Sequence, residues 1–428
     1  MYCGNCLRDN ALVATLRRMG HEVTMVPLYL PLTLDEVDQS AETPIFFSGI
    51  NVYLEQKSPL FRGSPAWLRK LLGSRKLLKW ASGKAAKTRP QDVGDITLSM
   101  LRGEEGNQAR DLNELIEWLK TQTKPDVVCL SNVLLIGMAR RLKQELNTAV
   151  VCMLQGEDWF LDALPESCRT ACWETIAERA REVDMLIAPS HYFGDVMLRR
   201  LNLPAGTVQV SWNGIQMAGF ESNSGPKSGP PAIGYFARLC AEKGMDTLVD
   251  AYLLLRKDPK NSRVQLWLGG SCGPADEPFV QAQLQKLKSA GVSQEVEVHP
   301  NLSRDQKIAF LKSLSVFSVP AKYGEAFGLY VVEAIAAGVP VVQPRTASYP
   351  ELIEASGGGV LCEPNDPRSL AKELQALLDD PEKSRALGAS GRAAALEQFS
   401  SEAMARSILA LYEQASRRKP AMAGARRL

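Results

Sequence analysis

The sequence predicts an α/β protein made of two successive halves, each a parallel sheet covered by helices, with the two sheets facing a cleft. Two observations support this prediction. Apolar runs of strand length alternate with amphipathic segments of helix length through most of the 428 residues, as in chains whose strands and helices take turns in a parallel sheet. The alternation stops once, at the Ser-, Gly- and Pro-rich stretch 221–231, and then restarts. That composition is typical of an exposed linker.

The first half, residues 1–220, predicts one helix followed by five strands with helices between them. The helix runs from about Asp9 to Arg18 and stops at Gly20, because glycine is a strong helix terminator. The strands are apolar runs of strand length. We expect them at Glu22–Leu28, Asp126–Ser131, Ala149–Gln155, Asp184–Ala188 and Val208–Trp212.

The second half, residues 232–399, repeats the alternation, and residues 400–428 add a last helix and a small, basic tail. Strands are expected at Ala232–Ala237, Val264–Leu268, Glu295–His299, Val316–Val319 and Val339–Gln343. Helices are expected near Gly244–Leu255, Asp276–Ala290, Phe327–Ala337, Pro367–Leu378 and Ala403–Ser416.

The composition excludes several classes of protein. Hydrophobic residues make up 45% of the chain, charged residues make up 23%, and the formal net charge is +2. These values are ordinary for globular proteins and provide no global charge for nucleic-acid binding. No uncharged run is long and apolar enough to span a bilayer, and no secretory signal pattern is visible, so we expect a cytoplasmic location.

The nine cysteines are an odd number in a large chain and indicate reduced thiols rather than a disulfide framework. Two pairs have local spacing, Cys3 with Cys6 and Cys168 with Cys172. Four thiolates suffice for zinc if the fold joins the pairs. The alternative is that they are small buried residues without a function of their own.

Residues 57–89 depart from the α/β pattern. They contain ten basic and no acidic residues, with Phe61, Trp67 and Trp80 among several leucines. Two interpretations stay open. The segment is either a solvated helical insertion whose leucines cover the N-terminal sheet, or a basic amphipathic helix that lies on an anionic membrane.

The stretch 320–340 carries the densest chemical information. A predicted strand runs into a glycine-bearing loop, and a helix then begins near Phe327. A helix start presents N–H groups and the positive end of the helix dipole, which suit a diphosphate. Glu325 in the loop and Glu333 about two turns into the helix can approach one ligand from different heights. By itself, this spacing also occurs on ordinary helix surfaces.

Two cations stand at the strand-to-helix junction that opens the second half. Arg238 follows a predicted strand, and Lys243 comes five residues later, just before Gly244 opens a helix. Such cations are placed to hold phosphate oxygens, the arginine as a planar fork and the lysine as a point charge. A pair of ordinary surface charges is the alternative. No Walker motif and no G-x-G-x-x-G after a strand is present, so neither a P-loop nucleotidase nor a dinucleotide dehydrogenase is predicted.

Taken in order, these motifs resemble the donor-binding half of glycosyltransferase family 4. This family consists of retaining enzymes with the GT-B fold of two Rossmann-like domains. In the first half, only the stretch 17–23 and the strand alternation are similar to it. The motifs that carry the resemblance are Asn213-Gly214-Ile215, Phe236-Ala237-Arg238, Glu242-Lys243-Gly244, Leu268-Gly269-Gly270, Glu325-Ala326-Phe327-Gly328-Leu329, Glu333-Ala334, Gly338-Val339-Pro340-Val341-Val342 and Glu351.

The resemblance implies a nucleotide-diphosphate sugar as donor. Arg238 and Lys243 would bind the diphosphate and stabilise the charge that grows on it as the glycosidic bond breaks. Glu325 would bind hydroxyls of the sugar, and Glu333 would hold the ribose. No cofactor and no metal are expected, because protein cations take the place of a divalent ion and the sequence offers no Asp-x-Asp. The backbone of Phe327, Gly328 and Leu329 would contact sugar and phosphate, and Asn301 and Leu302 would lie near the base.

One departure from the family concerns the acceptor side. In many relatives a histidine follows the strand that corresponds to 149–154, whereas this chain has Gln155-Gly156-Glu157-Asp158 there. A front-face retaining transfer, in which the leaving phosphate takes the acceptor proton, does not need that histidine. Glu157 and Asp158 are the nearest candidates for binding acceptor hydroxyls.

The sequence therefore predicts a retaining glycosyltransferase that moves a hexose from a nucleotide sugar to a hydroxyl acceptor. The acceptor would be lipid-linked if residues 57–89 bind a membrane. The alternative function is a catalytically weak sugar-nucleotide-binding protein of GT-B fold, and a GT-B epimerase or phosphorylase is a third.

The start of the chain carries one more expectation. Residues 1–6 resemble the turn after the first strand of the family, so the strand at 22–28 would be the second of the series. We therefore expect an apolar strand and a glycine turn before Met1, and a gap or strained pairing between the strand at 22–28 and the one at 126–131.

Overall fold

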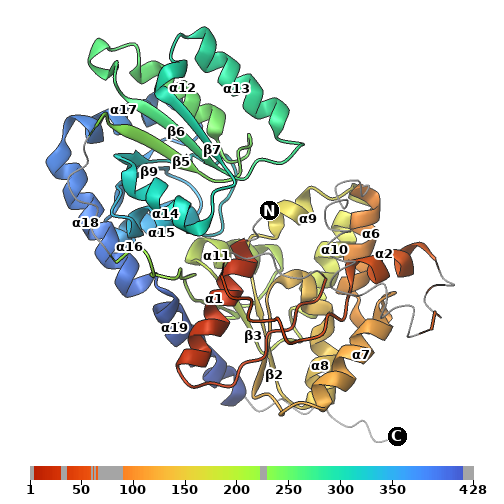
Figure 1. Ribbon diagram of the computed structural model, residues 1–428. Helices are drawn as coiled ribbons and strands as arrows, with labels where there is room; N and C mark the ends of the chain where they lie inside the picture. Colours follow the sequence, from red (N-terminus) through yellow and green to blue (C-terminus); the bar gives the residue numbers. More distant parts are fainter. Residues whose placement is uncertain are drawn as a thin grey trace, which may run out of the picture. The chain divides into compact units, whose positions relative to one another are not determined.

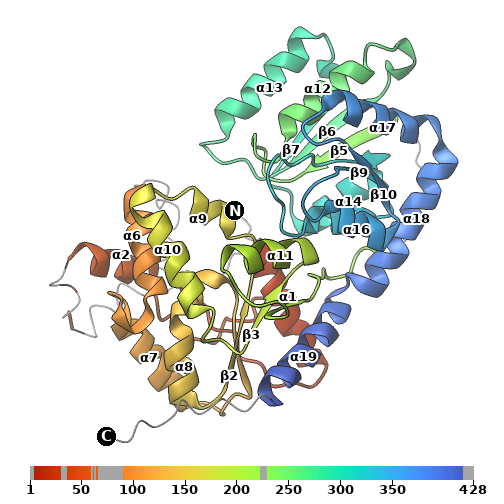
Figure 2. The ribbon, with the colours of Figure 1, turned by 180° about the vertical axis from the view of Figure 1, so that it is seen from behind.

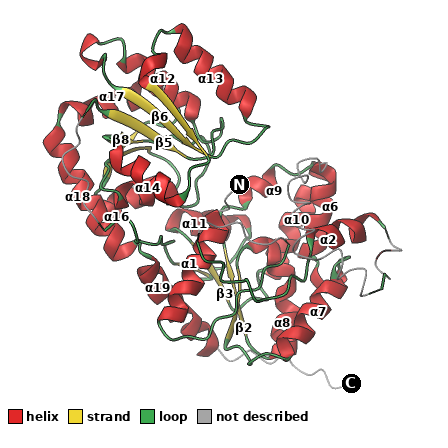
Figure 3. Ribbon diagram, in the orientation of Figure 1, coloured by secondary structure: helices red, strands yellow, loops and turns green. Residues whose placement is uncertain are grey.

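The computed structural model describes residues 4–29, 36–58, 61, 64–65, 90–221 and 229–417. They form two compact α/β units, coloured along the chain in Figures 1 and 2 and by secondary structure in Figure 3. The first unit comprises the described residues of 1–12 and 212–404, and the second unit those of 13–211 and 405–428. Each unit contains one parallel sheet, which confirms the predicted α/β class with two parallel sheets.

The sheet of the first unit has six parallel strands in the order β10-β9-β8-β5-β6-β7. The strand order reverses between β5 and β8, and ligands of such open sheets bind outside the carboxyl ends of the strands at the point of reversal. The sequence analysis did not predict β10, a short strand beside β9. The strands are β5 (Ala232–Phe236), β6 (Gln265–Gly270), β7 (Val296–Pro300), β8 (Val316–Phe317), β9 (Val341–Pro344) and β10 (Gly359–Cys362).

Helices cover both faces of this sheet (Figure 1). α12 packs with α13 and α17, whereas α15 packs with α14 and α18, and α16 with α18. In α12, Met245, Leu248, Val249 and Tyr252 are fully buried, at the spacing of one helix face. These helices are α12 (Met245–Leu255), α13 (Glu277–Ser289), α14 (Arg304–Ser313), α15 (Leu329–Ala336), α16 (Tyr349–Ser356), α17 (Pro367–Asp379) and α18 (Pro381–Gln398).

The sheet of the second unit has four parallel strands in chain order, β1 (Val127–Leu130), β2 (Ala149–Met153), β3 (Met185–Ala188) and β4 (Val208–Val210). β3 is buried along its whole length, as expected for a parallel strand covered on both faces. The remaining α-helices among the described residues are α1 (Gly4–Arg18), α2 (Gly49–Lys57), α6 (Pro90–Leu101), α7 (Ala109–Lys120), α8 (Ala139–Leu146), α9 (Asp158–Asp162), α10 (Glu166–Arg179), α11 (His191–Arg200) and α19 (Ser401–Arg417).

The strand predicted at Glu22–Leu28 is wrong. These residues form no strand, and side chains instead of a ladder hold their carbonyl groups. The guanidinium of Arg17 donates to the Val23 carbonyl oxygen at 2.6 and 2.8 Å, and the Thr43 hydroxyl donates to the Met25 carbonyl oxygen at 2.6 Å. An apolar pattern favours a strand, but only a paired neighbour makes one.

Within the part of the chain that the structure describes, β1 pairs with β2 alone. No ladder, strained or regular, therefore joins residues 22–28 to β1. The expectation of a further strand before Met1 stays a prediction.

Several sequence predictions fall on residues that the structure does not describe. These are most of the basic segment 57–89, the central part of the linker (222–228), the tail 418–428, and Cys3. Among the described helices, none is both long and apolar enough to cross a membrane.

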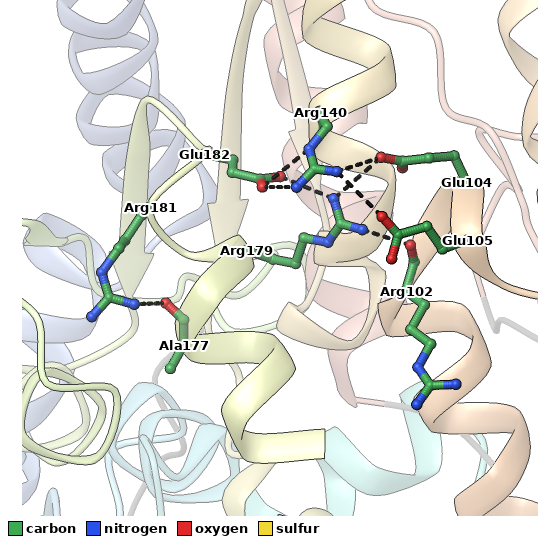
Figure 4. Close-up of polar contacts among 8 residues, drawn as sticks. All are labelled: Arg102, Glu104, Glu105, Arg140, Ala177, Arg179, Arg181 and Glu182. Carbon is green, nitrogen blue, oxygen red and sulfur yellow. Dashed lines mark hydrogen bonds and ion pairs between the residues drawn. The ribbon is translucent and has the colours of Figure 1, made fainter. Parts of the chain in front are cut away.

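Arginine and glutamate side chains connect three elements of the second unit (Figure 4). Arg140 of α8 pairs with Glu182 at 2.5 Å and with Glu104, in the 3-10 turn after α6, at 2.8 Å. Arg179 of α10 is 3% exposed and lies 3.4 Å from Glu104 and 3.3 Å from Glu182. It also donates to the Arg102 carbonyl oxygen at 2.7 Å. The shared carboxylates therefore hold the 3-10 turn against α8 and α10.

Candidate functional site

The predicted donor-site cations and Glu325 lie at the carboxyl ends of β5 and β8 in the first unit. Arg238 and Lys243 follow β5, and Glu325 follows β8. β5 and β8 are the two strands between which the strand order reverses. The residues singled out from the sequence thus lie where an open parallel sheet binds its ligands.

Arg238 is fixed by a carboxylate of the neighbouring loop. Its Nε lies 2.9 Å from Oδ2 of Asp276, and a terminal nitrogen lies 2.7 Å from Oδ1. The hydrogen bonds of this pair raise the pKa of Arg238 and lower that of Asp276. The salt bridge therefore gives the arginine side chain a fixed orientation. Because the side chain is also 48% exposed, a phosphate can reach its open side.

Lys243 forms an ion pair with Glu325. Its Nζ lies 2.5 Å from Oε2, and the two side chains are 18% and 15% exposed. The same Nζ lies 4.9 Å from the ring centre of Tyr323 and 5.1 Å from that of Tyr330, within the range of cation–π attraction. Burial lowers the pKa of Lys243, but the charge of Glu325, the neighbouring Tyr323 and the hydrogen bonds with both residues together outweigh this effect and raise the pKa. The ammonium group therefore keeps its charge.

Two tyrosine hydroxyls form a hydrogen-bonded chain that ends at the Glu325 carboxylate. The Tyr330 hydroxyl donates to Oε2 of Glu325 at 2.7 Å, and it lies 2.6 Å from the Tyr349 hydroxyl. Burial raises the pKa of both phenols well above their usual value, so both keep their hydrogen. Glu325 thus receives hydrogen bonds from a cation and from a chain of two hydroxyls.

The helix start predicted to bind a diphosphate lies beside this pair. α15 begins at Leu329, two residues later than expected. Gly328 precedes it with φ of 93°, a left-handed conformation that side chains rarely adopt. Phe327 is buried, and its carbonyl oxygen accepts from the Ser348 hydroxyl at 2.9 Å. The loop that follows β9 therefore holds the backbone just before α15.

Glu333 lies further along α15 and has a cation partner of its own. Lys307 of α14 places Nζ 2.5 Å from Oε1 of Glu333, and both side chains are 18% exposed. Asn301, which follows β7, is exposed in the left-handed region with φ of 56°, and its N–H donates to the Gly270 carbonyl oxygen at 2.9 Å. Leu302 packs against the core. Asn301 and Leu302 follow β7, the edge strand that β6 separates from β5, whereas Glu333 lies on α15, which begins shortly after Glu325.

The two acceptor-side candidates lie in the second unit and differ in burial and in hydrogen bonding. Glu157 is buried, and its carboxylate accepts from the backbone N–H groups of Val133 at 2.9 Å and Gln155 at 2.7 Å. Glu157 therefore joins the loops that follow β1 and β2. Asp158 is half-buried, and its Oδ1, which is itself buried, has no hydrogen-bond partner among the described residues. Burial raises the pKa of both carboxyls, and Asp158 has the greater capacity to accept a further hydrogen bond.

The described residues contain no group of three or more His, Cys, Asp or Glu side chains that could hold a metal ion. Their cysteines are free thiols, and Cys168 and Cys172 are buried.

Sequence reasoning missed the partners of the predicted residues. Asp276, Lys307 and Tyr349 come from other loops and helices, and no pattern in their own surroundings points to a carboxylate or cation elsewhere. Tyr330 had a signal, since it directly follows the Glu325-Ala326-Phe327-Gly328-Leu329 motif. Its hydroxyl could have been assigned to that motif.

Residues 220–394 match the family model described as glycosyl transferases group 1. Among solved structures, the chain is similar to Anabaena HepE in complex with UDP, with a TM-score of 0.62 and 18% identity over 73% of this chain and 84% of that one. It is also similar to sucrose-phosphate synthase from Thermosynechococcus elongatus, with a TM-score of 0.60 and 22% identity over 71% and 78%. The fold is GT-B. At these identities the likeness shows the fold alone.

Curated relatives extend the match in sequence. A D-inositol 3-phosphate glycosyltransferase of Xylanimonas cellulosilytica is 34% identical over 192 residues, which are 45% of this chain and 44% of the relative. A glycogen synthase of Mycobacterium tuberculosis is 26% identical over 302 residues, 69% of this chain and 70% of the relative. The chain thus spans less than half the length of the first of these relatives.

Proposed function

We propose that the protein is a retaining glycosyltransferase that moves a hexose from a nucleotide-diphosphate sugar to a hydroxyl acceptor. The observation that carries this proposal is the Lys243–Glu325 ion pair, 2.5 Å long, at the strand-order reversal of a GT-B sheet. In this proposal, Lys243 binds phosphate and the adjacent Glu325 binds sugar hydroxyls. The family match of residues 220–394 and the UDP complex of HepE support a nucleotide sugar as the donor.

In the proposed reaction, Arg238 and Lys243 oppose the charge that develops on the leaving diphosphate. Preorganised cations of this kind act most strongly in the transition state. Glu325 orients the sugar through its hydroxyls, and Glu333 accepts from the ribose. We propose that no metal is required, because the two protein cations supply the positive charge that a divalent ion provides elsewhere.

On the acceptor side, we propose that Asp158 accepts a hydrogen bond from the attacking hydroxyl or one next to it. Glu157 would act indirectly, by fixing the loops after β1 and β2. Retention of anomeric configuration is proposed because the Glu325 to Glu333 motif resembles that of retaining enzymes. The proton of the acceptor would pass to the leaving phosphate.

The test is incubation of the protein with UDP-glucose, GDP-mannose and ADP-glucose in the presence of EDTA, with release of nucleoside diphosphate followed over time. Release above the spontaneous rate from at least one donor supports an enzyme that needs no metal. Binding of a donor without release, also when hydroxyl acceptors and Mg²⁺ are added, favours the alternative of a catalytically weak sugar-nucleotide-binding protein. NMR of an α-linked donor and its product decides between retention and inversion.

A further inference from the structure

We propose that Tyr330 and Tyr349 are positioning residues that select which oxygen of Glu325 faces the donor sugar. The inference rests on the proposed function and deepens it, because it concerns how the donor sugar is recognised. It starts from the two hydrogen bonds that Glu325 receives at its carboxylate. Lys243 Nζ and the Tyr330 hydroxyl both bond to Oε2, at 2.5 and 2.7 Å.

The direction of the hydroxyl chain follows from counting hydrogens. Each phenol has a single hydrogen to donate, and Tyr330 gives its hydrogen to Glu325. Across the 2.6 Å contact between the two hydroxyls, Tyr349 must therefore be the donor. Its other acceptor, the Val319 carbonyl oxygen, is farther away at 3.4 Å. The chain runs from Tyr349 through Tyr330 to Glu325.

The chain is rigid at both ends. Tyr349 is fully buried and is the first residue of α16. The preceding Ser348, also fully buried, donates its N–H to the Glu325 carbonyl oxygen at 3.3 Å and its hydroxyl to the Phe327 carbonyl oxygen at 2.9 Å. One short segment thus holds both the backbone and, through Tyr330, the side chain of the Glu325 loop.

The consequence concerns the second oxygen of the carboxylate. Among the described residues, both side-chain hydrogen bonds to Glu325 arrive at Oε2. Oε1 is therefore the oxygen that remains for a sugar hydroxyl. Without the Tyr330 hydroxyl, Lys243 alone would hold Oε2, and the carboxylate of Glu325 could rotate about its Cγ–Cδ bond. Recognition of the sugar would weaken, whereas recognition of the diphosphate by Arg238 and Lys243 would stay.

This separation gives the test. Calorimetry measures the dissociation constants of wild-type protein and Tyr330→Phe for UDP-glucose, GDP-mannose and ADP-glucose. The dissociation constants for UDP, GDP and ADP are measured separately on the same two proteins. For the donor that the wild type binds, the variant should lose roughly three- to tenfold in affinity, the effect of one hydrogen bond. Affinity for the matching diphosphate should change less than about twofold. Tyr349→Phe should act in the same direction and more weakly, since it removes a bond to Tyr330 only.

Two controls separate positioning from folding. Tyr252→Phe removes another buried hydroxyl of the same unit, which donates to the Val264 carbonyl oxygen at 2.8 Å, and it should leave the ratio of the two affinities unchanged. In a Glu325→Gln background, Tyr330→Phe should have almost no further effect on that ratio, because residues that act through one another are not additive.

The proposal is overturned if Tyr330→Phe weakens nucleotide sugar and diphosphate by the same factor, if it changes neither, or if its effect adds fully to that of Glu325→Gln. Failure of the proposed function looks different. In that case the wild-type protein itself binds none of the three donors, and the inference falls with it.

Discussion

Arg238 and Asp276 form a two-pronged salt bridge across the loops that follow β5 and β6, with nitrogen–oxygen distances of 2.9 and 2.7 Å. The bridge gives the guanidinium a fixed direction before any ligand arrives. A group that is fixed in advance stabilises developing charge without a reorganisation cost during the reaction. If the proposed function holds, we therefore expect the salt bridge to affect turnover more than attraction of the donor.

We predict that Arg238→Ala lowers turnover more than donor binding. Loss of one preorganised group of this kind typically costs about 2.7–4 kcal/mol of transition-state stabilisation. The measurement is kcat beside the donor dissociation constant. Arg345→Ala is a matched control, because this arginine follows β9 and is 61% exposed, and it should behave as wild type. A loss of binding with unchanged turnover would count against the role of Arg238.

Glu333→Gln should weaken donor binding rather than turnover. A ribose contact is the same in the ground state and the transition state, so its loss raises KM and leaves kcat nearly unchanged. The variant also removes the negative charge that faces Lys307 at 2.5 Å, which should move the melting temperature slightly. If turnover collapses while affinity stays at the wild-type level, the assignment of Glu333 to the ribose is wrong.

Arg179→Ala should destabilise the second unit. Arg179 is 3% exposed, and its loss leaves Glu104 and Glu182 with Arg140 alone. Breaking a buried ion pair costs about 3 kcal/mol or more. Arg181→Ala removes the nearby arginine that contacts the Ala177 carbonyl oxygen (Figure 4) and should change the melting temperature little. Equal melting temperatures of the two variants would contradict the structural role of Arg179.

The same variant has a predicted pH dependence. Burial raises the pKa of Glu104, but its backbone hydrogen bond and the charges of Arg179 and Arg140 outweigh this effect and lower it. A lowered carboxyl pKa stabilises the fold above the unfolded value, and that stability is lost as the pH falls through the folded value. The difference in melting temperature between wild type and Arg179→Ala should therefore be largest near neutral pH. It should shrink below about pH 4.

Residues 57–89, with ten basic and no acidic side chains, predict salt-sensitive binding to anionic vesicles. Screening shortens to about 8 Å at physiological ionic strength, so sedimentation with phosphatidylserine vesicles should be strongest at low salt and disappear as salt rises. Vesicles of phosphatidylcholine alone are the control. Absence of binding at low salt would leave the interpretation as a solvated insertion.

Much of the fold was predictable because parallel strands have a local signature. Buried apolar runs such as Ala149–Met153 and Met185–Ala188 read as strands wherever they occur. The prediction at Glu22–Leu28 was wrong because a strand also requires a neighbour to pair with. β10 was missed because Gly359–Cys362 begins in a run of three glycines, which reads as a turn.

The sequence proposes candidate site residues one at a time and does not predict the contacts between them. Arg238, Lys243, Glu325 and Glu333 stood out because charged residues at strand ends and helix starts suit a diphosphate sugar. Their partners are set by contacts between segments far apart in the chain, such as Arg238 with Asp276. Local sequence patterns do not specify such contacts.

The central claim is that the Lys243–Glu325 pair serves transfer from a nucleotide sugar, and release of nucleoside diphosphate by wild-type protein and by Lys243→Ala tests it most directly. Donor binding is measured on the same two proteins. The account predicts that wild type releases the diphosphate and that the variant still binds donor but turns over at least about a hundredfold more slowly, as expected for the loss of a group that acts in the transition state. A variant that turns over at the wild-type rate would contradict it.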